Sequence, residues 1–77
     1  MTKREVLNEF AKADRFLSPN ELRVRLHWAL DLRSVYSYLL RLARQGLLQQ
    51  GATGRGRLVY RLTDRGRARL EYLKRRH

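Results

Sequence analysis

The sequence predicts a small, mostly helical α+β fold: three helices, a two-stranded β-hairpin and a C-terminal helix, in one domain that spans residues 1–77. Three observations predict it. Apolar residues recur at helical spacing in four segments, each preceded by a capping residue. A later segment alternates apolar and other residues at the period of a strand. The 77 residues, of which 43% are hydrophobic, suit one compact core and not two.

The first two helices are expected over about residues 2–13 and 19–28. Thr2 is placed to cap the first helix. Ser18 is placed to cap the second, where a proline follows at the first helical position and Glu21 can reach back to the cap. The core-facing side chains expected on these helices are Val6, Phe10, Ala13 and Leu17, then Leu22, Leu26 and Ala29.

The third helix is expected over residues 32–45. Asp31 can cap its start, and Gly46 supplies the left-handed residue that ends it. Because so few residues separate it from the second helix, the two must cross as a tight angular pair. Its core-facing side chains are expected to be Val35, Tyr38, Leu39 and Leu42.

The hairpin is expected to consist of residues 47–50 and 57–62, joined by a glycine-rich turn with basic residues near its tip. In the second strand, Leu58, Tyr60 and Leu62 alternate with the other residues. Thr63 is then placed to cap the fourth helix. The larger apolar contacts expected from that helix are Ala68, Leu70, Tyr72 and Leu73.

The charge favours a polyanionic partner. Lys and Arg number 18 against seven Asp and Glu, a formal net charge of +11. Residues 52–77 carry nine basic and two acidic side chains, against nine and five in residues 1–51. So many like charges on a small protein repel one another, and binding to a polyanion relieves that repulsion. Nucleic acid is the more usual partner, and an anionic membrane surface is the second candidate. Genome composition or thermal adaptation would explain why most of the basic residues are Arg and not Lys. Neither would explain why basic residues outnumber acidic ones so strongly.

Several function classes are not expected. Without Cys there is no disulfide, Cys-based zinc site or thiol chemistry. No apolar run is long enough for a membrane helix, and no signal-peptide core is found, so the protein is expected to be soluble and intracellular. His27 and His77 lie far apart, and no metal-binding, nucleophile-elbow or paired-carboxylate motif is present. No enzyme activity, cofactor, metal or small-molecule substrate is therefore predicted.

The order of the elements resembles the winged helix-turn-helix. Residues 34–48, SVYSYLLRLARQGLL, look like the recognition helix and first wing strand of MarR- and PadR-like regulators. Residues 58–66, LVYRLTDRG, look like their second wing strand and the Leu-Thr-x-x-Gly entry to the next helix. The resemblance covers about residues 6–73, without the long additional dimerisation helices of full-length members. It implies a small transcriptional regulator that binds double-stranded DNA, located in the cytoplasm and associated with the nucleoid.

The resemblance also implies where DNA is bound. An α-helix fits the major groove, so residues 32–45 are expected there, with the early residues at base edges. The wing, residues 49–58, is expected on the adjacent backbone or in the minor groove. The backbone N–H groups at the start of the second helix offer a further binding site for a phosphate. The expected contacts are Arg33 on guanine, Ser34 and Ser37 on a base or a phosphate, Tyr36 on a sugar or a thymine methyl group, Arg41 and Arg44 on phosphates, Arg55 and Arg57 in the wing, and Ser18 and Asn20 in the second helix.

Other interpretations stay open at this point. Each arginine of the third helix could belong to a solvated face, Tyr36 and Tyr38 could be core residues, and the loop glycines could serve only the turn. A basic fourth helix, with Arg65, Arg69 and Arg76, would also suit an RNA- or ribosome-associated winged helix. Leu40, Tyr36 and Trp28 could instead form a protein-interaction patch in a larger complex. A homodimer through the terminal helices is expected, because small cores gain from a partner and one winged helix contacts few base pairs.

Overall fold

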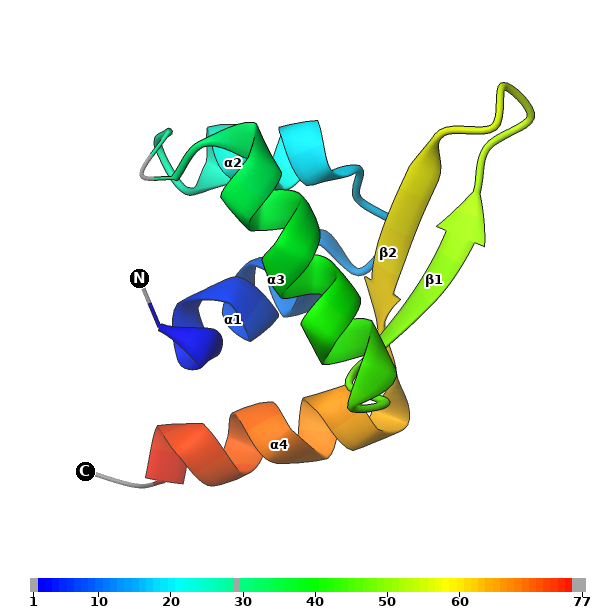
Figure 1. Cartoon of the computed structure of the whole chain (residues 1–77). Coiled ribbons are helices and arrows are strands. Elements are labelled where there is room, and N and C mark those ends of the chain that lie inside the picture. The colour runs from blue at the N-terminus through cyan, green and yellow to red at the C-terminus, as the bar shows by residue number, and fades with distance from the viewer. Residues whose placement is uncertain (1, 29, 76–77) are drawn as a thin grey trace.

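In residues 2–28 and 30–75, which the computed structural model describes, four helices and one antiparallel hairpin follow one another in the predicted order (Figure 1). They are α1 (Lys3–Ala13), α2 (Pro19–Arg25), α3 (Leu32–Arg44), β1 (Leu48–Ala52), β2 (Leu58–Leu62) and α4 (Asp64–Arg75). The expectations for Ala29, Arg76 and His77 concern positions outside the described residues. The predicted fold class is confirmed.

The predicted caps set where the helices begin, and they are Thr2, Ser18, Asp31 and Thr63. The second is the most complete. The Ser18 hydroxyl accepts a hydrogen bond from the Glu21 backbone N–H, and the Glu21 carboxylate accepts one from the Ser18 N–H, both at 3.1 Å. The Ser18 backbone donor, assisted by Arg15, lowers the pKa of Glu21. These local contacts fix the entry of α2.

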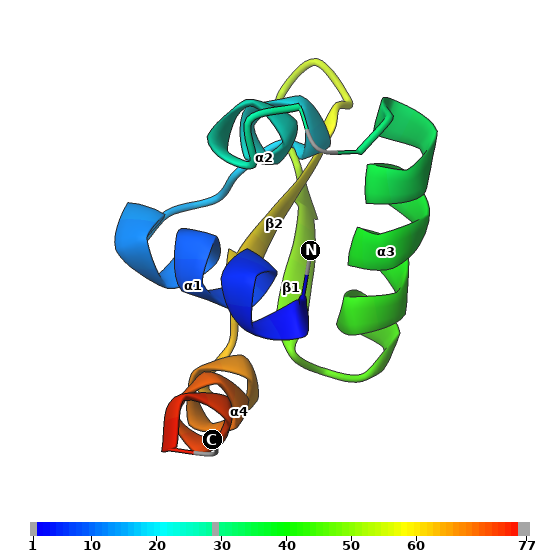
Figure 2. The same ribbon diagram turned by 90° about the vertical axis from the view of Figure 1, so that its left-hand side faces the viewer.

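One hydrophobic core lies between the three helices of the amino-terminal half, the hairpin and α4. Figure 2 shows α1 and α3 on either side of the hairpin, with α4 beneath them. The backbone of Leu17 pairs with that of Tyr60 through two hydrogen bonds of 2.8 Å, so the segment between α1 and α2 is tied to β2. The buried side chains are Val6, Leu7, Phe10, Leu17, Leu22, Val35, Leu39, Leu42, Leu47, Leu48, Tyr60, Leu62 and Leu70.

The amino end of α4 is fixed against the loop that follows α3. The Thr63 hydroxyl donates to the Gly46 carbonyl at 2.6 Å, and the Thr63 N–H donates to the Leu47 carbonyl at 3.1 Å. Gly46 has a φ of +78°, as its expected role in ending the third helix requires. A side chain on Gly66 would overlap the Leu47 carbonyl oxygen, so this position needs glycine for close approach. These contacts hold the end of α3 and the base of the hairpin together.

The expected end of the second helix is wrong: α2 ends at Arg25 and not near residue 28. His27 and Trp28 have φ angles of +57° and +61°, which interrupt the helix. The chain reverses there through hydrogen bonds from the His27 N–H to the Val24 carbonyl and from the Trp28 N–H to the Arg23 carbonyl, both 3.0 Å. Because no glycine marks the turn, the helical spacing of the apolar residues predicted a helix that was too long.

The expected strand bounds also need correction, because β1 covers residues 48–52 and not 47–50, and β2 begins at Leu58. Gly51 and Ala52, which have low strand propensity, are strand residues because they pair with Val59 and Leu58. At this outer end the hairpin extends past the helices. Leu58 is therefore exposed, whereas the alternation predicted it to be buried.

Two of the four contacts expected from the fourth helix are wrong. Leu70 is buried and Leu73 packs against the core, but Ala68 and Tyr72 are exposed. Only one narrow stripe of α4 contacts the rest of the protein, so apolar residues on its other sides face outward.

The third helix ends at Arg44, one residue before the expected end, a difference no larger than that between methods of assigning helix ends.

Candidate nucleic-acid interface

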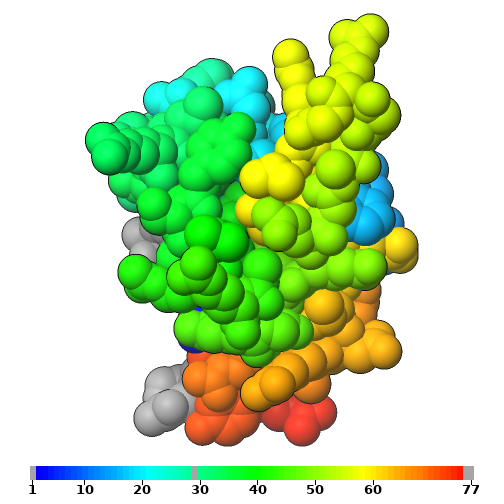
Figure 3. Space-filling view, turned by 45° about the vertical axis from the view of Figure 1, so that its right-hand side comes forward, coloured from blue at the N-terminus to red at the C-terminus, as the bar shows by residue number. Residues whose placement is uncertain are grey.

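α3 has one buried side and one uncovered side. The buried side carries Val35, Leu39 and Leu42. The other side lies at the surface of the molecule next to the wing, as Figure 3 shows. Because residues three and four apart lie above one another on a helix, the exposed positions share one face. The predicted site residues on this face are Arg33, Ser34, Tyr36, Ser37, Arg41 and Arg44, all exposed.

A shallow depression runs along the first half of this face. Its lining residues are Leu30, Arg33, Ser34, Ser37, Tyr38 and Arg41. Three hydroxyl-bearing residues and two arginines therefore border one concave surface. Hydroxyls bind either bases or phosphates, and guanidinium groups bind guanine edges or phosphates, so this set suits a DNA groove.

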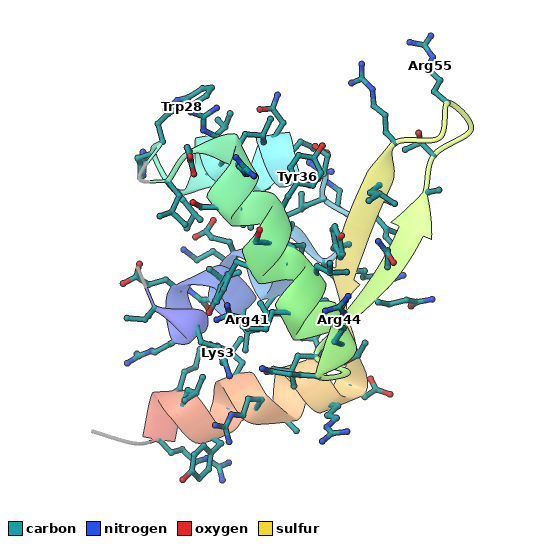
Figure 4. The ribbon with its side chains drawn as sticks, in the orientation of Figure 1. Lys3, Trp28, Tyr36, Arg41, Arg44 and Arg55 are labelled. Carbon is teal, nitrogen blue, oxygen red and sulfur yellow. The ribbon has the colours of Figure 1, made fainter. Side chains whose placement is uncertain are left out.

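The two tyrosines of α3 have different environments. Tyr38 packs against the core, and burial raises the pKa of its phenol, so it stays a neutral hydrogen-bond donor. Tyr36 is 44% exposed, which makes it a surface residue and not a core one. Figure 4 places Tyr36 on the side of α3 that faces the wing. Tyr36 is thus free to contact a ligand between α3 and the wing.

The tip of the wing is organised around Thr53. Its hydroxyl accepts hydrogen bonds from the backbone N–H groups of Arg55 at 3.3 Å and Arg57 at 3.2 Å. Its own N–H donates to the Arg57 carbonyl at 2.9 Å, and Gly56 completes the turn with a φ of +78°. Both arginine side chains are exposed, and Figure 4 shows Arg55 at the outer tip. The turn therefore presents two cations away from the body of the protein.

A second groove separates the start of α2 from the wing. Its polar lining consists of Ser18, Asn20, Glu21, Thr53 and Arg57. The Ser18 hydroxyl is engaged in the α2 cap, whereas Asn20 is exposed. The predicted residues are thus distributed over two separate depressions, one along α3 and one between α2 and the wing. Tyr36, Arg44 and Arg55 line neither.

The ion pairs of the described residues are Lys12–Glu9, Arg15–Glu21, Arg25–Glu9 and Arg67–Asp14. One ion pair reaches the groove between α2 and the wing, because Glu21, which lines that groove, is paired with Arg15. Within residues 2–28 and 30–75, no ion pair involves the five site arginines, namely Arg33, Arg41, Arg44, Arg55 and Arg57. The positive charge of these five arginines is therefore not neutralised by ion pairs within the described residues and can bind an external anion.

One carboxylate does lie at the start of α3. Asp31 accepts hydrogen bonds from Ser34, and these are the main cause of its lowered pKa, with the charges of Arg23 and Arg33 adding to it. The carboxylate is therefore ionised at neutral pH and already engaged in capping the helix. It orders the residues that precede the depression.

Comparison with known proteins identifies the family. The model of the PadR-like family of transcriptional regulators matches residues 20–72. The chain belongs to this family. A crystal structure of a PadR-like transcriptional regulator from Bacillus cereus matches with a TM-score of 0.76 and 25% identity, over 95% of this chain and 77% of that chain. No curated protein sequence matches the chain.

Membership confirms the PadR-like resemblance that the two sequence segments carried. This PadR-like protein has the winged-helix fold, and its family consists of DNA-binding transcriptional regulators and not of enzymes. In the described part of the chain, potential metal ligands do not gather in groups of three that could hold an ion. No helix in residues 2–28 and 30–75 is long and apolar enough to cross a membrane.

Sequence reasoning missed two features of this PadR-like surface. Thr53 was not singled out, although a threonine between two loop glycines is a turn signal. The contact of Arg23 with the Trp28 ring was also missed, because it depends on the left-handed turn. Leu40 is 38% exposed, and Tyr36 and Trp28, the other members of the alternative protein-interaction patch, are exposed as well.

Proposed function

We propose that this PadR-like regulator binds double-stranded DNA sequence-specifically, as a single winged-helix domain. Residues 32–45 enter the major groove, and residues 49–58 contact the adjacent backbone or minor groove. One observation carries the proposal: α3 and the wing bring five arginines that form no ion pair within the described residues to uncovered surfaces. A duplex offers a groove for the helix and phosphates for the wing.

The first half of α3 reads base edges in this proposal. Arg33 can bind guanine through two parallel hydrogen bonds. Ser34 and Ser37 bond bases or phosphates from the same depression, and Tyr36 contacts a sugar or a thymine methyl group. Further along the helix, Arg41 and Arg44 bind phosphates and fix the orientation of the protein.

The wing and the start of α2 hold the flanking backbone. Arg55 projects furthest and contacts the backbone or enters a narrow minor groove, where the negative potential is enhanced. Arg57, Asn20 and Ser18 line the neighbouring groove and take a phosphate there. These contacts add affinity without reading sequence.

The regulator acts as a homodimer in this proposal, with the terminal helices α1 and α4 at the interface. On α4, Tyr72 is exposed and Leu73 is half-buried, which supports an apolar contact with a second copy of the chain. Two copies on a palindrome would double the contacted sequence. Light scattering at micromolar concentration that finds only a 9.2 kDa species would contradict the dimer. A cytoplasmic, nucleoid-associated location follows from the DNA-binding role.

Selection of bound duplexes from a random pool tests the function and yields the site. Arg33→Ala should relax the preference at one base position, by about 1–3 kcal/mol. Arg55→Ala should weaken binding about equally on all sequences and reduce the salt slope by about 0.9. Arg67→Ala removes an arginine that is paired with Asp14 on another surface, and serves as the matched control.

Salt dependence provides the second part of the test. If six to ten phosphates are contacted, affinity should fall by roughly three to five decades between about 50 and 200 mM salt. Binding without salt dependence, or Arg33→Ala with an unchanged base preference, would contradict the proposal. Structured RNA that competes better than the selected duplex would favour the RNA-binding alternative.

A further inference from the structure

The single tryptophan of the chain lies on the surface at the turn between α2 and α3. Trp28 is 58% exposed, the largest exposure among the large hydrophobic residues of the described ranges. Tryptophan is enriched at binding interfaces, where its ring offers a large apolar surface and its N–H a hydrogen-bond donor. The exposed ring of Trp28 is therefore a candidate contact for a partner.

The turn that carries Trp28 is both strained and tightly held. His27 and Trp28 are consecutive non-glycine residues in the left-handed region, which is costly and is concentrated at functional sites. Arg23 holds the turn from two sides. Its Nε donates to the Leu30 carbonyl at 2.9 Å, and its guanidinium carbon lies 4.6 Å from the centroid of the Trp28 ring. The Arg23 contact therefore favours one orientation of the exposed ring.

This position is continuous with the proposed DNA surface. Trp28 comes shortly before Asp31, the cap of α3, and Leu30 lines the α3 depression. Figure 4 shows Trp28 and Arg55 near opposite ends of one edge of the molecule, with the start of α3 between them. A duplex with α3 in its major groove would meet the wing on one side of that groove and Trp28 on the other.

We infer that Trp28 packs against the sugar–phosphate backbone at the rim of the major groove, opposite the strand contacted by the wing. The inference rests on the proposed DNA binding and adds a contact to it. The exposed ring suits the apolar edge of deoxyribose, and the indole N–H suits a phosphate oxygen. The Arg23 guanidinium lies beside the ring, although the Asp31 carboxylate is near enough to feel its charge, so the ring itself supplies the main contact. The contact raises affinity and fixes orientation, but carries no sequence preference.

Fluorescence of the single tryptophan tests the contact directly. A short duplex of arbitrary sequence is titrated at low salt, and binding is followed separately by the anisotropy of a fluorescein-labelled copy. Saturation is expected to change the tryptophan emission and to reduce its quenching by acrylamide at least twofold. Anisotropy that reports binding while emission and quenching stay unchanged would overturn the inference and leave the proposed function intact. No binding by anisotropy would remove both.

Two substitutions of Trp28 distinguish the effect of losing the ring from the effect of losing the fold. Trp28→Gly removes the ring while relieving the left-handed backbone, so folding should be retained, as melting by circular dichroism would verify. Its affinity should fall about tenfold on every duplex, with an unchanged salt slope because no charge is lost. Trp28→Phe keeps an aromatic ring and should lose threefold or less. A folded Trp28→Gly variant with wild-type affinity, or with loss confined to particular sequences, would refute the contact.

Discussion

Replacement of Gly66 by alanine tests the packing of α4 against the end of α3. Alanine favours a helix over glycine by about 1 kcal/mol, so an unconstrained position would gain stability. At this position the new methyl group would overlap the Leu47 carbonyl oxygen and lie 2.8 Å from Leu62 Cδ1. The obstacle is backbone, which cannot rotate away, and the same carbonyl accepts the Thr63 N–H.

The expected net effect is destabilisation. Overpacking costs about 1–3 kcal/mol, and a weakened hydrogen bond adds about 1 kcal/mol, against the helical gain. We therefore expect Gly66→Ala to lower the free energy of unfolding by about 1–3 kcal/mol in urea, followed by far-ultraviolet circular dichroism. Gly54→Ala is the matched control, because its methyl group would meet no atom within 4 Å and it should stay within about 0.5 kcal/mol. A Gly66→Ala variant at least as stable as Gly54→Ala would refute the packing.

Two further predictions concern the α2 cap and the wing. Because the pKa of Glu21 is lowered in the folded state, its stabilisation is present above its ordinary pKa of 4.5 and is lost as pH falls through the folded value. Glu21→Gln should therefore reduce the loss of melting temperature between about pH 6 and 3, whereas Glu71→Gln should not; equal acid sensitivity in both variants would contradict this. Thr53→Val should lower DNA affinity about threefold to tenfold and speed amide exchange in residues 54–57, with little change in melting, because two backbone donors lose their acceptor. Unchanged exchange at those amides would argue against that role for Thr53.

The candidate site was predictable as a set of residues but not as a surface. Helical spacing placed Arg33, Ser37 and Arg41 together, since the spacing of a helix depends only on positions a few residues apart. The charge sum likewise predicted a polyanionic partner. Which arginines are free of acids could not be predicted, because Arg67 pairs with Asp14 across the fold from a distant part of the chain.

The sequence by itself determined the order of the elements, the four capping residues, the left-handed Gly46 and the excess of positive charge. These features depend on contacts within a few residues or on composition alone. Tertiary structure decided that α2 ends at Arg25, that Gly51 lies in a strand and that Gly66 has no room for a side chain. The strand position of Gly51 and the lack of space at Gly66 depend on atoms brought together from distant parts of the chain, which local patterns do not record. The end of α2 depends on two left-handed non-glycine residues, a conformation that their residue types do not predict.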